Sequence, residues 1–408
     1  MKTDSRKPGF NNTMKRYGFL FEKICDPDNL YQAFLHARRG KGWYDEVKLI
    51  SERPWYYLAA LRDKLINGEY RTSEYTMFLR QEGKKTREIY KLPFYPDRIV
   101  HWAILQVIEP ILLNSFTSDT YSAIPGRGIH AAAKNLRHDL DIHPDEMNIT
   151  VKTDCKKFYQ SITHDILMEK FRKLFKDEKL LALLEEIVRS ISTCPATKEN
   201  IEYYSRWGPV KIIDRNGLKY IYGIGIPIGN YLSQYEANFY LSDFDHWLKE
   251  DQGVRFCYRY MDDETICLPD KPTAHRVLDN MQEYLDEHDH IRLKDNYQIF
   301  PTFVRGIDFV GYRFFKDYTL LRKSTATELK RKMTKIIEKG RSGKELSFHE
   351  YCCVNSYAGW LKFCDGKNLE KKYIEPAMVY AGQYYDAHLR KRGKDHERLW
   401  DSREYCEA

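Results

Sequence analysis

The feature that most restricts the fold is a pair of short strand-forming runs separated by only three residues. Residues 254–260 and 264–268 are rich in β-prone side chains, and residues 261–263 between them are few enough for a tight hairpin. A further strand is predicted over residues 147–153, and a long helix over residues 231–249. Strands that alternate with long helices predict an α+β fold and exclude an all-helical one.

The composition places the chain among ordinary globular proteins. Of its 408 residues, 42% are hydrophobic and 31% are charged, which excludes the disordered and fibrous classes. A formal net charge of +7 suits a polyanionic partner without requiring one. The nine cysteines include no C-x-x-C pair, so we interpret them as reduced thiols. No apolar run is long enough to span a membrane, and we therefore expect a cytoplasmic protein with no membrane partner.

Three aspartates at the ends of the predicted strands are candidates for a metal site. Asp154 follows the strand over residues 147–153, whereas Asp262 and Asp263 lie at the tip of the hairpin. If these strands are neighbours, the three carboxylates meet at one edge of the sheet. Nucleotidyl transfer by two metal ions requires such oxygen ligands from separate segments. An isolated Asp-Asp pair in a turn is more often structural, because aspartate is a common turn residue.

The residues around these aspartates resemble the reverse transcriptase family. Tyr260-Met261-Asp262-Asp263 has the Y-x-D-D pattern of that family, and further blocks follow in the family's order. They are Arg87 with residues 97–101, then 121–128, for the fingers, 154–162 and 225–238 for the palm, and 309–312 for the primer grip. The resemblance covers roughly residues 87–323. It implies a right-hand polymerase fold with fingers, palm and helical thumb.

The same resemblance divides the chain into four parts. They are an N-terminal helical extension over residues 1–85, fingers over 86–148, a palm over 149–320, and a helical thumb with a C-terminal tail over 321–408. The palm would combine an antiparallel sheet with helices. Residues 192–222 are polar and aromatic, with a hairpin turn predicted at Asn216-Gly217, and we interpret them as an insertion.

The activity that the resemblance implies is RNA-directed DNA polymerisation with two Mg²⁺ ions, for which Mn²⁺ can substitute. The implied metal ligands are Asp154, Asp262, Asp263 and the backbone carbonyl of Cys155. The second aspartate of such pairs often acts indirectly. Asp263 would accordingly support the primer end or the metal.

A second group of residues is implied in nucleotide binding. Besides Cys155 it comprises Arg87, Arg127, Tyr159, Gly229 and Gln234. The guanidinium groups of Arg87 and Arg127 can pair with phosphate oxygens, although each can equally form a surface ion pair. Tyr159 lies five residues after Asp154, where the family has a bulky residue against the sugar 2′ position, so it would exclude ribonucleotides. Gly229 leaves room for a base or sugar, or simply permits a helix to start.

The basic segment over residues 322–344 carries nine lysine and arginine residues and few acidic ones. Taken alone, it reads as the solvated face of a helix. The family resemblance implies instead that this segment belongs to a thumb that binds the duplex backbone. Lysine side chains neutralise phosphates whatever the nucleotide sequence. Tyr357 and Trp360 can stack on nucleic acid, but aromatic residues three apart on a helix are more often core.

The second palm block indicates a branch of the family. Group II intron proteins and many other bacterial reverse transcriptases carry Q-G-x-x-x-S-P there, whereas this chain has Ile228-Gly229 and then Ser233-Gln234. That pattern resembles the reverse transcriptases of diversity-generating retroelements, and so do residues 355–369. The implied partners are dNTPs, the DNA product, a dedicated non-coding or template-repeat RNA, and a small basic accessory protein.

Three other functions fit parts of this sequence. Antiphage defence reverse transcriptases, which copy a dedicated non-coding RNA, share the core and would accommodate both the insertion and Glu264 after the aspartate pair. A binding module without catalysis would not need the carboxylates. A metal-dependent nuclease would need carboxylates, but neither the fingers blocks nor a residue in the position of Tyr159.

Overall fold

The predicted hairpin lies within a five-stranded sheet. The computed structural model describes residues 16–82 and 85–390, and the sheet has the strand order β3-β7-β8-β4-β9. Its strands are β3 (Thr120–Tyr121), β4 (Ile149–Asp154), β7 (Phe256–Tyr260), β8 (Asp263–Leu268) and β9 (Gln298–Pro301). β3 runs parallel to β7, and the other neighbours are antiparallel. The strands predicted from the sequence are thereby confirmed.

The chain forms two compact units, each made of two segments. The first unit contains residues up to 115 together with 157–241, and the second contains 116–156 together with residues from 242 onward. The five-stranded sheet belongs wholly to the second unit.

Helices and a small sheet complete the second unit. α6 (Ile129–Ile142) contacts β3 and β7, while α13 (Lys271–His288) contacts β4 and β8. A three-stranded sheet follows in the chain, with the order β10-β11-β12. Its members and the remaining elements are β10 (Ile307–Phe309), β11 (Tyr312–Phe314), β12 (Thr319–Leu321), α12 (Ser242–Glu250), α14 (Thr302–Arg305), α15 (Lys323–Arg341), α16 (Phe348–Leu361), α17 (Lys367–Leu369) and α18 (Glu375–His388), with short turns at Pro144–Glu146 and Glu370–Ile374.

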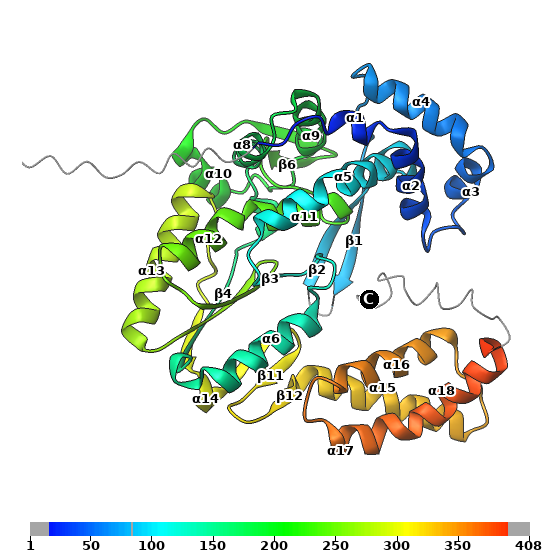
Figure 1. Cartoon of the computed structure of the whole chain (residues 1–408), viewed down its shortest axis with the longest axis vertical. Helices are drawn as coiled ribbons and strands as arrows, with labels where there is room; N and C mark the ends of the chain where they lie inside the picture. Colours follow the sequence, from blue (N-terminus) through cyan, green and yellow to red (C-terminus); the bar gives the residue numbers. More distant parts are fainter. Residues whose placement is uncertain (1–15, 83–84, 391–408) are drawn as a thin grey trace, which may run out of the picture. The chain divides into compact units, whose positions relative to one another are not determined.

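One hydrophobic core joins these elements of the second unit. It runs from Leu136 of α6 through Tyr258 of β7 and Phe309 of β10 to Met333 of α15 and Val354 of α16. α15 is amphipathic, and its buried residues are Leu329, Met333, Ile336 and Ile337. Figure 1 shows α15, α16 and α18 as neighbouring helices. The predicted helical C-terminal part is therefore a packed bundle, and residues 391–408 of the predicted tail lie outside the described residues.

The first unit is mostly helical. α2 packs on α5, α5 contacts α11, and α8 contacts α9 and α11. β1 and β2 pair as an antiparallel hairpin (Figure 1). The elements are α1 (Phe21–Ile24), α2 (Pro27–Arg38), α3 (Asp45–Glu52), α4 (Pro54–Ile66), β1 (Thr76–Glu82), β2 (Lys85–Lys91), a turn at Phe94–Arg98, α5 (Ile99–Ser115), α7 (Phe158–Ser161), α8 (His164–Leu174), α9 (Glu178–Arg189), α10 (Lys198–Tyr204), a turn at Ser205–Trp207, β5 (Ile212–Arg215), β6 (Leu218–Ile221) and α11 (Tyr231–Tyr240).

The predicted insertion folds as a small substructure of the first unit. β5 and β6 form a hairpin whose turn is Asn216-Gly217, as predicted, and both turn residues have positive φ. A local hydrophobic cluster supports it, comprising Cys194, Tyr203, Tyr204, Ile221 and Ile224. α10 precedes the hairpin, which the sequence interpretation did not anticipate.

The prediction of a single long helix over residues 231–249 is wrong. The structure has two helices there, α11 and α12, separated at Leu241, where ψ is near 3°. Apolar residues continue at helical spacing on both sides of the break, so periodicity alone did not reveal it. The chain passes from the first unit to the second at this point.

None of the helices within the described residues is both long and apolar enough to cross a membrane.

Candidate active site

Backbone pairing brings the three candidate aspartates together in the second unit. Asp154 is the last residue of β4 and Asp263 the first of β8, and the two are directly opposite each other in the antiparallel register. Asp262 lies in the turn that precedes β8, and its carbonyl accepts a hydrogen bond from the N–H of Cys155 at 3.3 Å. The carboxylates therefore come from two neighbouring strands and meet at one end of the sheet.

The turn itself has an uncommon backbone conformation. Met261 has φ of +57°, a left-handed conformation that residues other than glycine seldom adopt. Its carbonyl accepts a hydrogen bond from Nη1 of Arg259 at 3.0 Å. Met261 and Asp262 thus form a two-residue connection between β7 and β8. Arg259 holds the peptide group between these two residues by its hydrogen bond to the Met261 carbonyl.

The three carboxylates lie in a strongly charged environment. Burial, and then the negative charge of Asp154, raise the pKa of Asp262 to about 6. Burial also raises the pKa of Asp263, against the opposing effect of the Lys152 amine 3.2 Å away. Lys294 forms an ion pair with Asp154. Two acidic groups in close proximity repel each other, and cationic partners offset that repulsion.

The donor set is suited to hard divalent cations. Carboxylate oxygens converge from two strands, and Oδ1 of Asp154 is buried without a hydrogen-bond partner. Lysine amines already lie against Asp154 and Asp263, which marks this end of the sheet as a place where positive charge is stabilised. As the side chains stand, no three His, Cys, Asp or Glu residues within 16–82 and 85–390 are grouped closely enough to hold a metal ion. The three aspartates thus fit a divalent cation in donor type and in backbone placement, whereas their side-chain positions do not form a closed ligand set.

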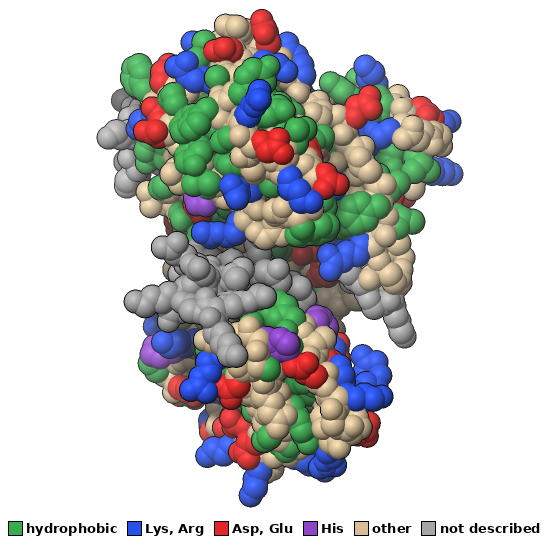
Figure 2. Space-filling view, turned by 90° about the vertical axis from the view of Figure 1, so that its right-hand side faces the viewer, with side chains coloured by type: hydrophobic (Ala, Val, Ile, Leu, Met, Phe, Trp, Pro, Cys, Tyr) green, Lys and Arg blue, Asp and Glu red, His purple; other side chains and the backbone are tan. Residues whose placement is uncertain are grey.

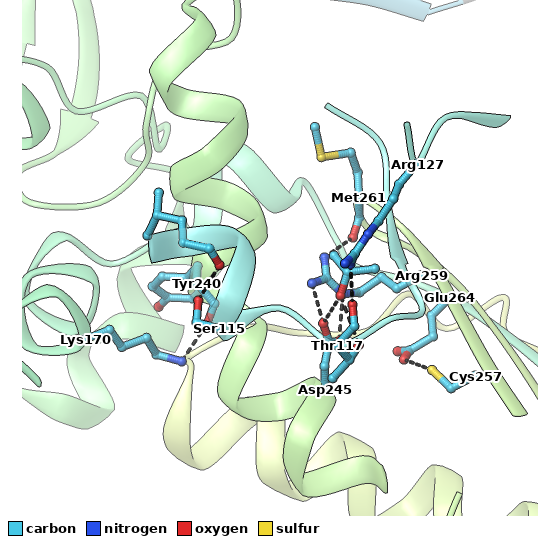
Figure 3. A network of polar contacts seen from close by, with 12 residues as sticks. Ser115, Thr117, Arg127, Lys170, Tyr240, Asp245, Cys257, Arg259, Met261 and Glu264 are labelled. Atoms are coloured by element: carbon cyan, nitrogen blue, oxygen red, sulfur yellow. Dashed lines mark hydrogen bonds and ion pairs between the residues drawn. The ribbon is translucent and has the colours of Figure 1, made fainter. Parts of the chain in front are cut away.

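Arg127, predicted to bind nucleotide or template, lies in the same unit. Its Nη1 donates a hydrogen bond to the carbonyl of Thr117 at 2.8 Å (Figure 3). Neither of the sequence alternatives, phosphate binding or a surface ion pair, anticipated this contact with the backbone.

The remaining predicted nucleotide-binding residues belong to the first unit. Arg87 is exposed on β2, opposite Arg80 of β1. Tyr159 is half-buried in α7, and its carbonyl accepts a hydrogen bond from Ile226 at 2.9 Å. Gln234 is half-buried in α11.

The structure explains why position 229 is a glycine, which the sequence alone did not. Its φ is +120°, and a Cβ there would lie 3.0 Å from the carbonyl oxygen of Tyr90 and 3.0 Å from Cγ2 of Ile89. The preceding carbonyl, of Ile228, accepts a hydrogen bond from the N–H of Tyr90 at 2.9 Å. The glycine therefore lets this loop approach β2 closely.

The aromatic residues of α16 favour the core alternative. Tyr357 is buried, and Trp360 packs against Gly311, where an added Cβ would lie 2.4 Å from a ring carbon. The hydroxyl of Tyr312 donates to the carbonyl of Trp360 at 3.0 Å. These contacts join α16 to the turn between β10 and β11.

Three charged residues close to the aspartates were not singled out from the sequence. They are Lys152, Arg259 and Lys294. Lys152 and Arg259 are each the one basic residue of a largely buried β-strand, and a basic side chain inside such a strand is the signal that could have found them. Lys294 carries no comparable signal, since it lies in an irregular segment before β9.

Comparison with known proteins decides the family. The model of the family described as reverse transcriptase (RNA-dependent DNA polymerase) matches residues 79–314, more than half of the chain. The chain belongs to the reverse transcriptase family. The predicted α+β fold is accordingly that of a reverse transcriptase domain. Members of this family generally use divalent metal ions.

Curated relatives match at low identity. Protein YkfC of Escherichia coli is 25% identical over 239 residues, which cover 57% of each chain. The group II intron-encoded protein LtrA of Lactococcus lactis is 21% identical over 236 residues, which cover 56% of this chain and 35% of that protein. The match thus spans about half, or less, of the length of these relatives.

Solved structures of telomerase are also similar. Apo telomerase from Candida tropicalis gives a TM-score of 0.44 at 12% identity, covering 78% of this chain and 58% of that one. Telomerase from Candida albicans with a fragment of telomeric RNA gives 0.40 at 12% identity, covering 82% and 65%.

Proposed function

We propose that this reverse transcriptase copies a template RNA of a diversity-generating retroelement into cDNA, with Asp154, Asp262 and Asp263 as the carboxylates of its active site. The observation that carries the active site is the register of β4 and β8, which sets Asp154 opposite Asp263 with Asp262 in the adjoining turn. Two antiparallel strands are a rigid mount for groups that must hold metal ions at a fixed separation.

Each residue has a distinct role in this proposal. Asp154 and Asp262, with the carbonyl of Cys155, would hold two Mg²⁺ ions, and Asp263 would support them or the primer end. The chemistry that bound ions would supply is a lower pKa of the primer 3′-hydroxyl and neutralisation of charge on the pyrophosphate leaving group. Mn²⁺ has the same preference for oxygen ligands and can substitute.

The nucleotide would be recognised by the residues that the family resemblance implies. Arg87 pairs with the triphosphate and Arg127 with nucleotide or template, since guanidinium groups bind phosphate oxygens in pairs. Tyr159 excludes ribonucleotides by a steric clash with the 2′-hydroxyl. Gly229 and Gln234 lie beside the base and template.

We further propose the division into an N-terminal extension, fingers, palm and thumb at the boundaries given above. The exposed side of α15 supports a role in gripping duplex, because Lys323, Lys330, Arg331 and Lys335 are exposed opposite its buried side. Figure 2 shows lysine and arginine side chains interspersed with acidic ones over the lower part of the face in view. Contacts from such lysines and arginines to phosphate oxygens do not depend on the nucleotide sequence.

The retroelement assignment rests on the second palm block, Ile228-Gly229 with Ser233-Gln234. Its expected partners are a template-repeat or dedicated non-coding RNA and a small basic accessory protein. A second candidate is antiphage defence, which the folded insertion with its own apolar cluster and the buried Glu264 favour. Neighbouring genes separate the two, since a template and variable repeat pair favours diversification and a structured non-coding RNA among defence genes favours immunity.

Primer extension tests the active site. Wild-type protein should extend an oligo(dT) primer on poly(rA) with dTTP and Mg²⁺, and a folded Asp262→Asn variant should not. The substitution keeps the shape of the side chain and removes its charge. Equal extension rates for the two proteins would refute the assignment of Asp262. Failure of the wild type, even with its co-purified RNA supplied, would refute the polymerase function of the isolated chain.

A further inference from the structure

A fully buried arginine lies directly behind the candidate catalytic turn. Arg259 of β7 is only 1% exposed, although arginine is among the residues least often buried. Its Nε and Nη2 donate to the two carboxylate oxygens of Asp245 at 2.7 and 2.5 Å. Its Nη1 points the other way and donates to the carbonyl of Met261 at 3.0 Å (Figure 3). One guanidinium group thus joins a helix to the turn.

The helix side of this contact is itself fixed. Asp245 belongs to α12 and is 3% exposed. Its Oδ2 also accepts a hydrogen bond from Oγ1 of Thr120 at 2.8 Å. Thr120 lies on β3, opposite Arg259 in the parallel pair of β3 and β7. Because the carboxylate is held from two elements, the guanidinium plane has little freedom to rotate.

Stability alone does not require such a pair. A buried ion pair is often no better for stability than apolar side chains of the same volume, because both charges must lose their water. Apolar residues could join α12 to β7, but they could not donate a hydrogen bond to the turn. The third bond of Arg259 is therefore the feature that a purely structural contact would lack.

The hydrogen bond to the Met261 carbonyl also restricts the backbone orientation of the next residue, Asp262. The carbonyl of Met261 and the N–H of Asp262 belong to one planar peptide group, so fixing the first fixes the second. The following peptide group is held from the other side, since the carbonyl of Asp262 accepts from the N–H of Cys155 at 3.3 Å. Both peptide groups that flank Asp262 are thus held by hydrogen bonds.

We propose that Arg259, anchored by Asp245, is a positioning residue that sets the orientation of Asp262 for nucleotidyl transfer. The proposal rests on the proposed function, in which Asp262 is a carboxylate of the active site. Arg259 touches neither substrate nor reacting atoms. It acts through the Met261 peptide group, and its loss should affect the speed of chemistry more than the binding of substrates.

Pre-steady-state incorporation of dTTP on poly(rA) primed with oligo(dT) tests this proposal in the full-length chain. The burst rate constant reports the chemistry of each folded molecule, whereas the burst amplitude reports how many molecules are folded. Arg259→Lys keeps a positive charge for Asp245 but cannot donate in three directions with the fixed fork of a guanidinium. We expect its burst rate constant to fall about 10–100-fold, with primer-template affinity unchanged within about twofold.

The matched control is another buried cation that donates to a backbone carbonyl. Lys170 of α8, in the first unit, is 7% exposed and donates to the carbonyl of Tyr240 at 2.6 Å (Figure 3). Lys170→Met should lower the melting temperature and the burst amplitude but leave the burst rate constant unchanged.

The outcomes are distinct. An Arg259→Lys protein with reduced amplitude but the wild-type rate constant would overturn the positioning role. If Arg259→Lys does not fold, Asp245→Asn decides by the same criterion, because it loosens the anchor while Arg259 stays in place. A wild-type rate in Asp262→Asn would instead refute the proposed active site, so the two failures are distinguishable.

Discussion

Replacing Glu236 with glutamine should remove the pH dependence that this one residue gives to the free energy of unfolding. Glu236 lies in α11, is 2% exposed, and has an Oε1 atom without a hydrogen-bond partner. Burial raises the pKa of this carboxyl from 4.5 to about 8, with Ser233 offering only partial compensation. The folded protein therefore holds a proton that the unfolded chain releases at lower pH. The causes of this pKa shift are burial and the hydrogen bond from Ser233, and they include no charged side chain.

The sign and size of the effect follow from proton linkage. Between about pH 4.5 and about pH 8 the folded state binds more protons than the unfolded state, so the free energy of unfolding falls as pH rises. One pKa unit is worth about 1.4 kcal/mol, so the loss between pH 5 and pH 8 is about 3 kcal/mol. Glutamine does not titrate. The Glu236→Gln protein should therefore gain about 3 kcal/mol over the wild type across that interval.

Urea unfolding of both proteins at several values across this pH range measures the effect, with the fluorescence of the first unit's aromatic residues as one probe. Other titrating groups cancel when the variant is subtracted from the wild type at each pH. Glu202→Gln, at an exposed position of α10, is the matched control and should show no change. Parallel pH profiles for wild type and Glu236→Gln would refute the reasoning, since they would mean that the buried carboxyl is ionised in the folded protein.

Two further substitutions test the nucleotide site and the packing of α16. Tyr159→Ala should raise the incorporation of UTP relative to dTTP by about 10-fold or more, because it removes the steric clash with the 2′-hydroxyl; an unchanged UTP to dTTP ratio would eliminate this role for Tyr159. Gly311→Ala should cost about 1–3 kcal/mol, since φ is +86° and the new Cβ would lie 2.4 Å from the Trp360 ring. Gly359→Ala, where nothing lies within 4 Å of the added Cβ, is its control in thermal denaturation; equal melting temperatures for the two variants would contradict the packing argument.

Local sequence was sufficient to place the parts of the site that depend on backbone periodicity. The alternation of residues in β4 and the three residues between the β-prone runs 254–260 and 264–268 predicted the strands and the hairpin, which the structure closes with two residues. Asp262 and Asp263 follow from that hairpin alone, because a short connection leaves little choice of geometry. The family blocks predicted the reverse transcriptase fold, which the family match to residues 79–314 confirms.

The sequence signalled other features without giving their cause. Gly229 stood out as a glycine at a place where space is needed, yet the neighbour that requires the space is the backbone of β2, well over a hundred residues earlier. Trp360 could be assigned to nucleic acid or to core from its spacing. Only the packing against Gly311 decided for the core.

The sequence by itself determined which carboxylates stand at the ends of which strands, because the pattern of a strand and its turn is encoded within a few residues. The tertiary structure alone decided what holds them there. Arg259 reaches both Asp245 of α12 and the carbonyl of Met261, and Lys294 reaches Asp154 across 140 positions of sequence. Contacts of that kind depend on which elements pack together, and the free energy of that packing is a property of the whole chain rather than of any local window.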